Sequence, residues 1–219
     1  DAARYACPLI GGDTVRTPGP LTLSITALGS TPAGRMVPRG GARPGDALYV
    51  SGTIGDAALG LRVRAGTADW GAALDAAARA HLLARYLTPE PRHALRHAVR
   101  AHARAAMDVS DGLVGDLAKM MRAAGVAARV ELARTPFSPA ARQAIALDAG
   151  AFETAVTGGD DYELLCAVAP EASAAFEAEA RAAGVPVTRI GVVEAGQGDV
   201  LLGVDGRPRA FARGSFSHF

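Results

Sequence analysis

The acidic segment Asp108-Val-Ser-Asp-Gly-Leu113 is the part of this chain whose residue types and spacing are best suited to chemistry. It follows an apolar residue, and leucine and methionine recur after it at helical spacing, so we expect a strand to pass into a helix here. Asp111 then falls at or near the helix N-cap, where a carboxylate is favoured. Asp108 and Asp111 would face one pocket, and their oxygens suit Mg²⁺, which proteins usually share with substrate phosphates. The plainer alternative is that Asp111 only caps the helix and Asp108 only ends the strand.

Two further turns combine paired glycines with an acidic residue. The first ends an apolar run at Pro8-Leu-Ile-Gly-Gly-Asp-Thr14, and the second, Gly158-Gly-Asp-Asp161, directly precedes an apolar strand. Paired glycines permit positive φ and a close approach of backbone to ligand, while the acids can bind a metal or a hydroxyl group. Taken singly, each is more often just a turn. Three acidic turns in one chain indicate the metal and substrate turns of one extended site for phosphate chemistry.

The lysine content narrows the class of phosphate-binding protein. Lys119 is the only lysine, and the chain has no Gly-x-x-x-x-Gly-Lys-Ser/Thr motif. A P-loop enzyme needs that lysine, and a protein kinase needs its own strand lysine, so both classes are disfavoured. Phosphate charge must instead be met by metal ions, backbone N–H groups and arginine.

Composition is that of a cytosolic enzyme. The 219 residues are 49% hydrophobic and 21% charged, which is enough for a substantial core and for one or two domains. A net charge of +1 gives no indication of nucleic acid or an anionic membrane as a partner. No apolar run reaches membrane-spanning length. Cys7 and Cys166 match no paired metal motif and are expected to be reduced thiols.

The hydrophobic patterns predict an α+β protein. The alternating segment Leu21–Leu28 is typical of a half-buried strand, and residues 30–46, rich in Gly, Pro and Arg, are typical of a linker. His93 and His97 could share a zinc ion on one helix face, but no third ligand is evident and a solvated basic face is the better interpretation. Further helices are expected at 56–64, 72–86, 91–103, 111–124, 138–147 and 171–183, and strands at 47–51, 127–132, 187–193, 200–204 and 209–211.

Five stretches, in this order along the chain, resemble the thiamine-monophosphate kinase family of the aminoimidazole ribonucleotide synthetase-like superfamily: residues 9–14, 38–56, 107–113, 158–164 and 214–219. The resemblance implies a two-domain α+β fold of that superfamily. Residues 1–29 would be the end of an N-terminal domain that binds ATP and Mg²⁺ and forms a homodimer. Residues 30–46 would be the linker and residues 47–219 an intact α/β C-terminal domain. Most of the N-terminal domain is expected to lie upstream of Asp1 or to have been lost.

The resemblance also implies roles for individual residues. It assigns ATP binding to Gly12, Asp13, Arg39 and Ser110, and the binding of several Mg²⁺ ions to Asp13, Asp108 and Asp111. Asp160 stands where the family usually has Glu, one methylene longer, and would contact the substrate either directly or through water. Phe216 matches the aromatic residue of the family's C-terminal motif and would lie against the ring system of the substrate, although Ser217 replaces the usual Asp.

The activity that this resemblance implies is direct transfer of the γ-phosphoryl group of ATP to thiamine monophosphate, giving thiamine diphosphate in a cytoplasmic biosynthetic pathway. The acceptor is an ionised phosphate oxygen, so little general-base help is needed and no catalytic nucleophile is assigned. The alternatives are another ATP-dependent synthetase of the superfamily and a non-catalytic fragment that binds thiamine phosphate. Residues 1–219 alone are expected to be inactive.

Overall fold

The computed structural model describes residues 1–198 and 200–215, and the chain divides into two units, residues 1–36 and 37–219. All residues of the first unit are described, and they form turns without any helix or strand. The prediction of a strand at Leu21–Leu28 is therefore wrong. Leu21 and Ile25 are 88% and 91% exposed. Alternation encodes which face of a strand would be buried, but a strand forms only where another strand pairs with it.

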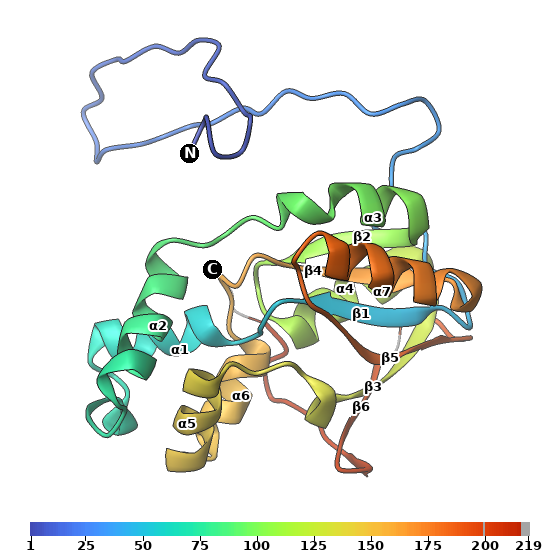
Figure 1. Cartoon of the computed structure of the whole chain (residues 1–219). Coiled ribbons are helices and arrows are strands. Elements are labelled where there is room, and N and C mark those ends of the chain that lie inside the picture. The colour runs from blue at the N-terminus through green and yellow to red at the C-terminus, as the bar shows by residue number, and fades with distance from the viewer. Residues whose placement is uncertain (199, 216–219) are drawn as a thin grey trace. The chain divides into compact units, whose positions relative to one another are not determined.

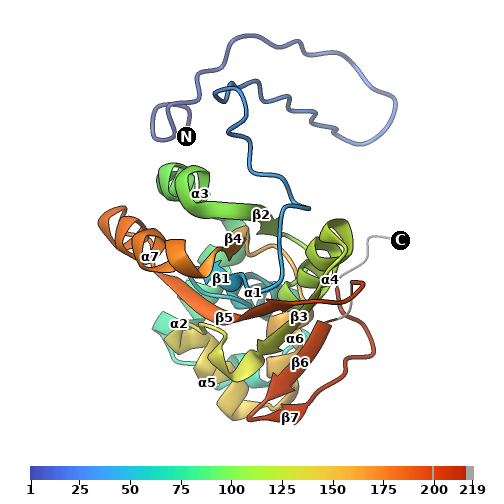
Figure 2. The ribbon, with the colours of Figure 1, turned by 90° about the vertical axis from the view of Figure 1, so that its right-hand side faces the viewer.

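Within the described part of the second unit, seven strands form one sheet in the order β2-β4-β1-β5-β3-β6-β7 (Figures 1 and 2). Neighbouring strands are antiparallel except β3 and β6, which are parallel. The strands are β1 (Ala47–Ser51), β2 (Ala103–Val109), β3 (Ala127–Glu131), β4 (Glu163–Val168), β5 (Val187–Glu194), β6 (Val200–Val204) and β7 (Arg207–Pro208).

Helices cover both faces of this sheet. The α-helices are α1 (Asp56–Ala65), α2 (Ala76–Leu87), α3 (Arg96–His102), α4 (Leu113–Ala124), α5 (Pro139–Leu147), α6 (Gly150–Thr157) and α7 (Ser173–Ala182), and short 3₁₀ turns lie at Asp69–Ala72, His93–Leu95, Leu132–Arg134 and Pro170–Ala172. The α+β class is confirmed.

Three hydrophobic clusters fix these layers. Helix α4 packs Leu117 and Met120 against one face of the sheet, together with Leu48 and Val109. Helices α3 and α7 cover the other face, where Phe176 meets Tyr49 edge-on with ring centroids 5.3 Å apart. Figure 2 shows α4 apart from α3 and α7, with the sheet between them. Helices α1, α2, α5 and α6 pack on one another in a cluster of their own, next to the end of β1.

Several predicted boundaries are wrong. The helix expected at 72–86 begins instead after Asp75, because the side chain of Asp75 accepts the N–H of Ala78 and caps the helix there. The helix expected at 91–103 is a 3₁₀ turn followed by the short α3, since its last residue already begins β2. Helix α6 was not predicted, because its Gly start resembles a loop. The last strand lies at Arg207–Pro208 and not at 209–211.

Candidate active site at two paired acidic turns

The turn after β2 and the turn before β4 lie side by side. Strands β2 and β4 are antiparallel partners, so the end of one meets the start of the other, with Val109 opposite Glu163. Beyond this pair the contact continues through backbone: Asp160 donates its N–H to the carbonyl of Ser110 at 2.8 Å, and Tyr162 donates to Val109 at 2.9 Å. The structure therefore brings Asp108, Ser110, Asp111 and Asp160 into one region, as the sequence predicted.

Glycines allow the two turns to approach this closely. A Cβ on Gly159 would lie 2.3 Å from the carbonyl oxygen of Ser110, and one on Gly112 would lie 2.5 Å from the carbonyl oxygen of Thr157. Real Cβ atoms do not come so near to backbone, so a side chain at either position would force the turns apart. The sequence suggested that such glycines admit a ligand, but in the structure Gly112 and Gly159 admit the neighbouring turn.

Negative charge is concentrated around the phenol of Tyr162. The pKa of Tyr162 is raised, first by partial burial and then by the charges of Asp160, Asp108 and Asp111. Tyr162 is nevertheless 41% exposed, so this group of acids opens to solvent. A solvent-exposed cluster of carboxylates favours the binding of a cation, or of a phosphate that carries a metal ion.

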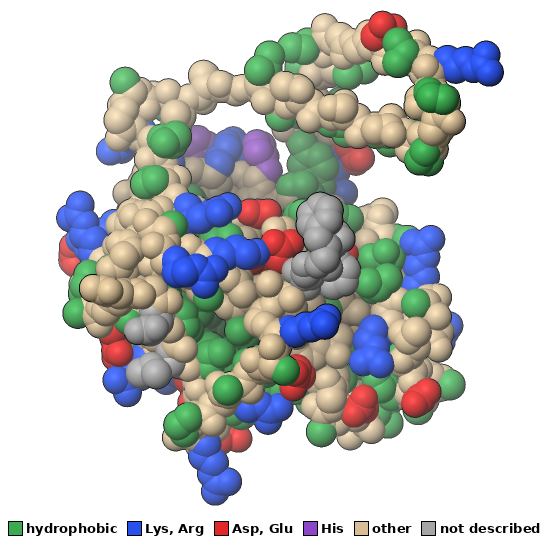
Figure 3. Space-filling model, turned by 180° about the vertical axis from the view of Figure 1, so that it is seen from behind, with side chains coloured by type: hydrophobic (Ala, Val, Ile, Leu, Met, Phe, Trp, Pro, Cys, Tyr) green, Lys and Arg blue, Asp and Glu red, His purple; other side chains and the backbone are tan. Residues whose placement is uncertain are grey.

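Asp116 and Lys119 support this acidic turn from within α4, and sequence reasoning missed both. One oxygen of Asp116 accepts the N–H groups of Ser110 and Asp111, at 3.0 and 2.9 Å, and its other oxygen contacts Lys119 Nζ at 2.8 Å. Lys119 also contacts the carboxylate of Asp111. Burial alone would lower the pKa of Lys119, but the two carboxylates outweigh burial and raise it. Figure 3 likewise shows acidic side chains next to Lys and Arg side chains on one face.

Helix α4 is capped in an unexpected way. Its N-cap is Gly112, with Asp111 one residue earlier, and no side chain of the N-cap residue bonds to the helix, so the alternative in which Asp111 only caps the helix is wrong. The side chain that receives the turn's N–H groups is Asp116, in the first turn of the helix. The carboxylate of Asp111, about one-third exposed, therefore stays available to solvent apart from its contact with Lys119. The signal in the sequence was the i, i+3 pair of Asp116 and Lys119, which is typical of a helical ion pair.

The residues next to Arg39 and Phe216 in the sequence, Pro38 and Ser215, contact the strand and the helix that flank the turn with Asp108 and Asp111. Ala106 of the edge strand β2 donates its N–H to the carbonyl of Pro38 at 3.3 Å, which places the residue before Arg39 two positions from Asp108. At the other end, Gly115 packs against Ser215, since a Cβ on Gly115 would lie 2.3 Å from Ser215 Cβ. Phe216, predicted to contact the substrate, lies outside the described residues.

Gly12 and Asp13 belong to the first unit and are described by themselves. Both are exposed, and Asp13 accepts the N–H of Thr14 at 2.8 Å. Among residues 1–198 and 200–215, no three His, Cys, Asp or Glu side chains form a group that could hold a metal ion. Asp108 and Asp111 still fit Mg²⁺ chemically, because this ion is usually held by one or two carboxylates with phosphate and water as its other ligands.

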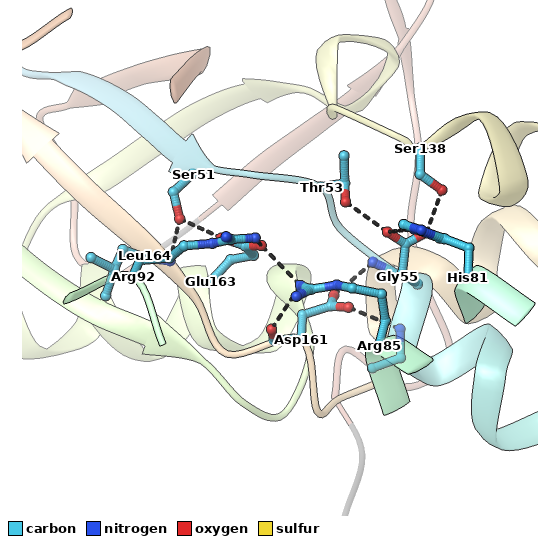
Figure 4. Close-up of polar contacts among 12 residues, drawn as sticks. Ser51, Thr53, Gly55, His81, Arg85, Arg92, Ser138, Asp161, Glu163 and Leu164 are labelled. Atoms are coloured by element: carbon cyan, nitrogen blue, oxygen red, sulfur yellow. Dashed lines mark hydrogen bonds and ion pairs between the residues drawn. The ribbon is translucent and has the colours of Figure 1, made fainter. Parts of the chain in front are cut away.

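A buried ionic cluster is centred on Glu163, the first residue of β4, which follows the Gly-Gly-acid turn in the sequence (Figure 4). Glu163 is fully buried, and its carboxylate accepts hydrogen bonds from Ser51 Oγ at 2.6 Å, Arg85 Nη2 at 2.9 Å and Arg92 Nε at 2.7 Å. Buried charge is tolerated where it is paired and hydrogen-bonded in this way. The cluster ties the start of β4 to α2 and to the segment that follows it. Sequence reasoning missed it, because the partners are 71 to 112 positions apart.

A second polar group surrounds the buried carboxylate of Asp56 and contains the residue types of a catalytic triad. Asp56 accepts hydrogen bonds from His81 Nε2 at 3.0 Å and from Thr53 Oγ1 at 2.6 Å, and also contacts the hydroxyl of Ser138 (Figure 4). Both Ser138 and His81 therefore bind the same carboxylate, whereas a triad needs the histidine to take the serine proton. Ser138 also caps α5 by accepting the N–H of Ala141 at 3.0 Å. This group holds α1, α2 and α5 together.

The family model described as AIR synthase related protein, C-terminal domain, matches residues 43–203. The chain belongs to this family. Its resemblance to thiamine-monophosphate kinases is also confirmed by proteins of that name: one from Caulobacter vibrioides is 47% identical over 201 residues, covering 90% of this chain and 55% of that protein. One from Salmonella typhimurium is 40% identical over 216 residues, covering 98% and 64%. The chain thus spans between 55% and 64% of the length of these two relatives.

Solved structures agree with this family assignment. The crystal structure of thiamine-monophosphate kinase from Stenotrophomonas maltophilia is 39% identical, with a TM-score of 0.69 over 80% of this chain and 55% of that one. A structure described as AaThiL complexed with AMPPCP and TMP is 31% identical, with a TM-score of 0.68 over 84% of this chain and 55% of that one. Among the described residues, no helix has the length and apolar character needed to cross a membrane.

Proposed function

We propose that the complete protein containing this chain transfers the γ-phosphoryl group of ATP to thiamine monophosphate, giving thiamine diphosphate and ADP. The observation that carries this proposal is the hydrogen-bonded pairing of the two acidic turns, with the charges of Asp108, Asp111 and Asp160 all acting on the phenol of Tyr162. The relatives named thiamine-monophosphate kinase, and the related structure with AMPPCP and TMP, support the choice of substrates.

Each side chain has a role that its chemistry suits. Asp108 and Asp111 would hold Mg²⁺. Asp13, in the first unit, would also bind a Mg²⁺ ion, and Gly12 would approach ATP through its backbone. Ser110 can donate its hydroxyl proton to a phosphate oxygen, and Arg39 carries a fixed charge suited to bidentate phosphate binding. Asp160, and Phe216 beyond the described residues, would contact thiamine monophosphate.

Transfer between these substrates needs positioning more than proton chemistry. The acceptor is a phosphate oxygen that is already ionised at neutral pH, so a general base at the acceptor is dispensable. Bound Mg²⁺ would neutralise the negative charge of the facing phosphates. The protein's own contribution is to hold both phosphate groups in line and to keep the carboxylates in place, which is catalysis by orientation and preorganised charge.

The proposal extends to assembly and location. Residues 1–29 would be the end of an N-terminal domain that binds ATP and Mg²⁺ and forms a homodimer, residues 30–46 the linker and residues 47–219 the C-terminal domain. Several Mg²⁺ ions would be bound per site. The enzyme would act in the cytoplasm, without nucleic acid or membrane as a partner.

Binding measurements separate this function from its alternatives. Isothermal titration of the complete protein with thiamine monophosphate and with ATP, each with and without Mg²⁺, should show binding of both ligands, with ATP binding strictly dependent on Mg²⁺. Binding of thiamine monophosphate without any binding of Mg-ATP would indicate a non-catalytic module. Binding of Mg-ATP without thiamine monophosphate would indicate another ATP-dependent synthetase and would overturn the proposal.

A further inference from the structure

The backbone of the turn that carries Asp160 is strained. Asp160 and Tyr162 have φ values of 72° and 51°, in the left-handed region. Among the other non-glycine residues of the described chain, only Ala6 and Asp205 have positive φ. A side chain in this region clashes with its own backbone, and a bulky one such as Tyr adopts it rarely. Such strain persists only where the surrounding structure holds the backbone in place.

Asp161, between these two residues, is held by the N-terminus of α1. Its side chain is 1% exposed, and its two carboxyl oxygens accept the N–H groups of Gly55 at 2.6 Å and Ala57 at 3.2 Å (Figure 4). These belong to the first N–H groups of the helix, which have no partner inside it and favour an acidic group. Gly55 has no side chain to cap the helix, so Asp161 supplies the cap from a different part of the chain.

The main chain of Asp161 is fixed as well. Arg85 Nη2 donates to its carbonyl oxygen at 3.2 Å and also to the buried carboxylate of Glu163 at 2.9 Å. The neighbouring N–H groups are bonded as well, that of Asp160 to the carbonyl of Ser110 and that of Tyr162 to the carbonyl of Val109 at the end of β2. With its side chain and its carbonyl both held, the peptide units on either side of Asp161 have little freedom to rotate into an unstrained conformation.

We propose that Asp161 is a positioning residue for the reaction: by capping α1 with its buried carboxyl group, it holds Asp160 and Tyr162 in the left-handed conformation and so directs Asp160 toward the substrate. The inference rests on the proposed function, because it takes Asp160 as the residue that contacts thiamine monophosphate. It gives adjacent acids opposite tasks, with Asp160 facing the ligand and Asp161 facing the protein.

A purely structural role for Asp161 would produce a different result. If Asp161 only caps α1, its loss should loosen the helix N-terminus without altering the turn. Asp75 provides a matched control, because its carboxylate caps α2 by accepting the N–H of Ala78, in the same helix, at 2.7 Å. Comparison of D161A with D75A therefore separates loss of a helix cap from loss of the turn's geometry.

The test uses the complete protein and two measurements, ligand affinity by isothermal titration and amide hydrogen exchange by NMR. In D161A, the dissociation constant for thiamine monophosphate should rise about tenfold or more, since a small misplacement of a binding group is costly. That for Mg-ATP should stay within about twofold, as for independent sites. Exchange should accelerate at the amides of Asp160 and Tyr162. D161N, which keeps one oxygen for Gly55, should recover part of the substrate affinity.

Two results would contradict the positioning role of Asp161. The inference is overturned if exchange in D161A accelerates only at Gly55 and Ala57, with substrate affinity unchanged as in D75A. Should D161A fail to fold, native-state exchange of the unaltered protein decides the matter: the amides of Gly55, Ala57, Asp160 and Tyr162 should open with one common free energy, and independent opening of the two pairs refutes the coupling. If the unaltered protein binds no thiamine monophosphate, the proposed function fails while the exchange measurement still tests the positioning role.

Discussion

The N–H of Asp160 lies 2.8 Å from the carbonyl oxygen of Ser110, and this hydrogen bond joins two motifs that are about fifty positions apart in the sequence. Ser110 stands between the two carboxylates assigned to the metal, and Asp160 is the side chain assigned to the substrate. The bond thus links the place where the donor phosphates would lie to the place where the acceptor would lie. A side chain that forces the two turns apart is therefore expected to disturb both places.

Replacing Asp108 by Asn should leave the fold intact but lower the rate of the complete enzyme about 10²-fold or more, because an amide fills the same space without balancing metal charge in the transition state. Steady-state turnover at saturating substrates measures the effect, and circular dichroism checks the fold. Asp69→Asn, at an exposed carboxylate of a 3₁₀ turn, serves as the control. A rate for D108N within about threefold of the parent would contradict the metal role.

Replacing Gly159 by Ala should destabilise the protein by about 1–3 kcal/mol, the usual range for overpacking. The added methyl group would stand 2.3 Å from the carbonyl oxygen of Ser110, so the two turns must separate. Urea unfolding measures the loss. Gly29→Ala is the matched control, since nothing lies within 4 Å of a Cβ there. Equal stability of G159A and G29A would show that the contact between the turns is not needed.

The sequence predicted the acidic turns and most elements of the second unit because those features depend on local patterns. Asp108 and Asp160 could each be placed on a turn, because an acid before a helix and a Gly-Gly-acid turn before a strand are short-range signals. Their grouping in one site came from the recurrence of acidic turns and from the family resemblance. The support beneath them could not be predicted: Glu163 and Arg85 meet only in the folded chain, 78 positions apart, and their neighbours in sequence are apolar. The strand expected at Leu21–Leu28 failed for the same reason, since its pattern does not specify a partner.

Replacing Phe216 by Ala should weaken the binding of thiamine monophosphate much more than that of Mg-ATP. Stacking on an aromatic ring contributes about 0.5–1.5 kcal/mol beyond burial of area. The adjacent Ser215 packs against Gly115 in the first turn of α4, the helix that follows the turn with Asp108 and Asp111. Titration of both ligands measures the difference. Equal losses for the two ligands would mean that the C-terminal segment is only structural.

Stability should depend on pH through Asp161. Burial raises the pKa of Asp161 to about 8, although the N–H groups of Gly55 and Ala57 act to lower it. The folded protein therefore holds this proton more tightly than the unfolded chain does, and the stabilisation is complete below pH 3.8 and is lost as pH rises through about 8. We expect the difference between the urea midpoints of the parent and of D161N to decrease as the pH is raised from about 5 to about 8. If this difference in midpoint increases with pH instead, folding lowers the pKa of Asp161 and the prediction is wrong.

Residues 1–219 alone, verified by mass to begin at Asp1, should be inactive with saturating Mg-ATP and thiamine monophosphate. Of the residues proposed to bind ATP, the first unit contains only Gly12 and Asp13, and its Leu21–Leu28 segment has no strand partner in the described chain. An unpaired apolar segment of this kind is prone to association. Turnover equal to that of the complete protein would show that the ATP site is wrongly placed.

Product analysis of the complete protein tests the central claim most directly. The protein is incubated with Mg-ATP and thiamine monophosphate, and thiamine diphosphate, ADP, AMP and inorganic phosphate are quantified over time. We predict that thiamine diphosphate and ADP form in equal amounts, with neither AMP nor free phosphate, and that chelation of Mg²⁺ stops the reaction. Release of ADP and free phosphate without thiamine diphosphate would contradict the assignment of thiamine monophosphate as the phosphoryl acceptor.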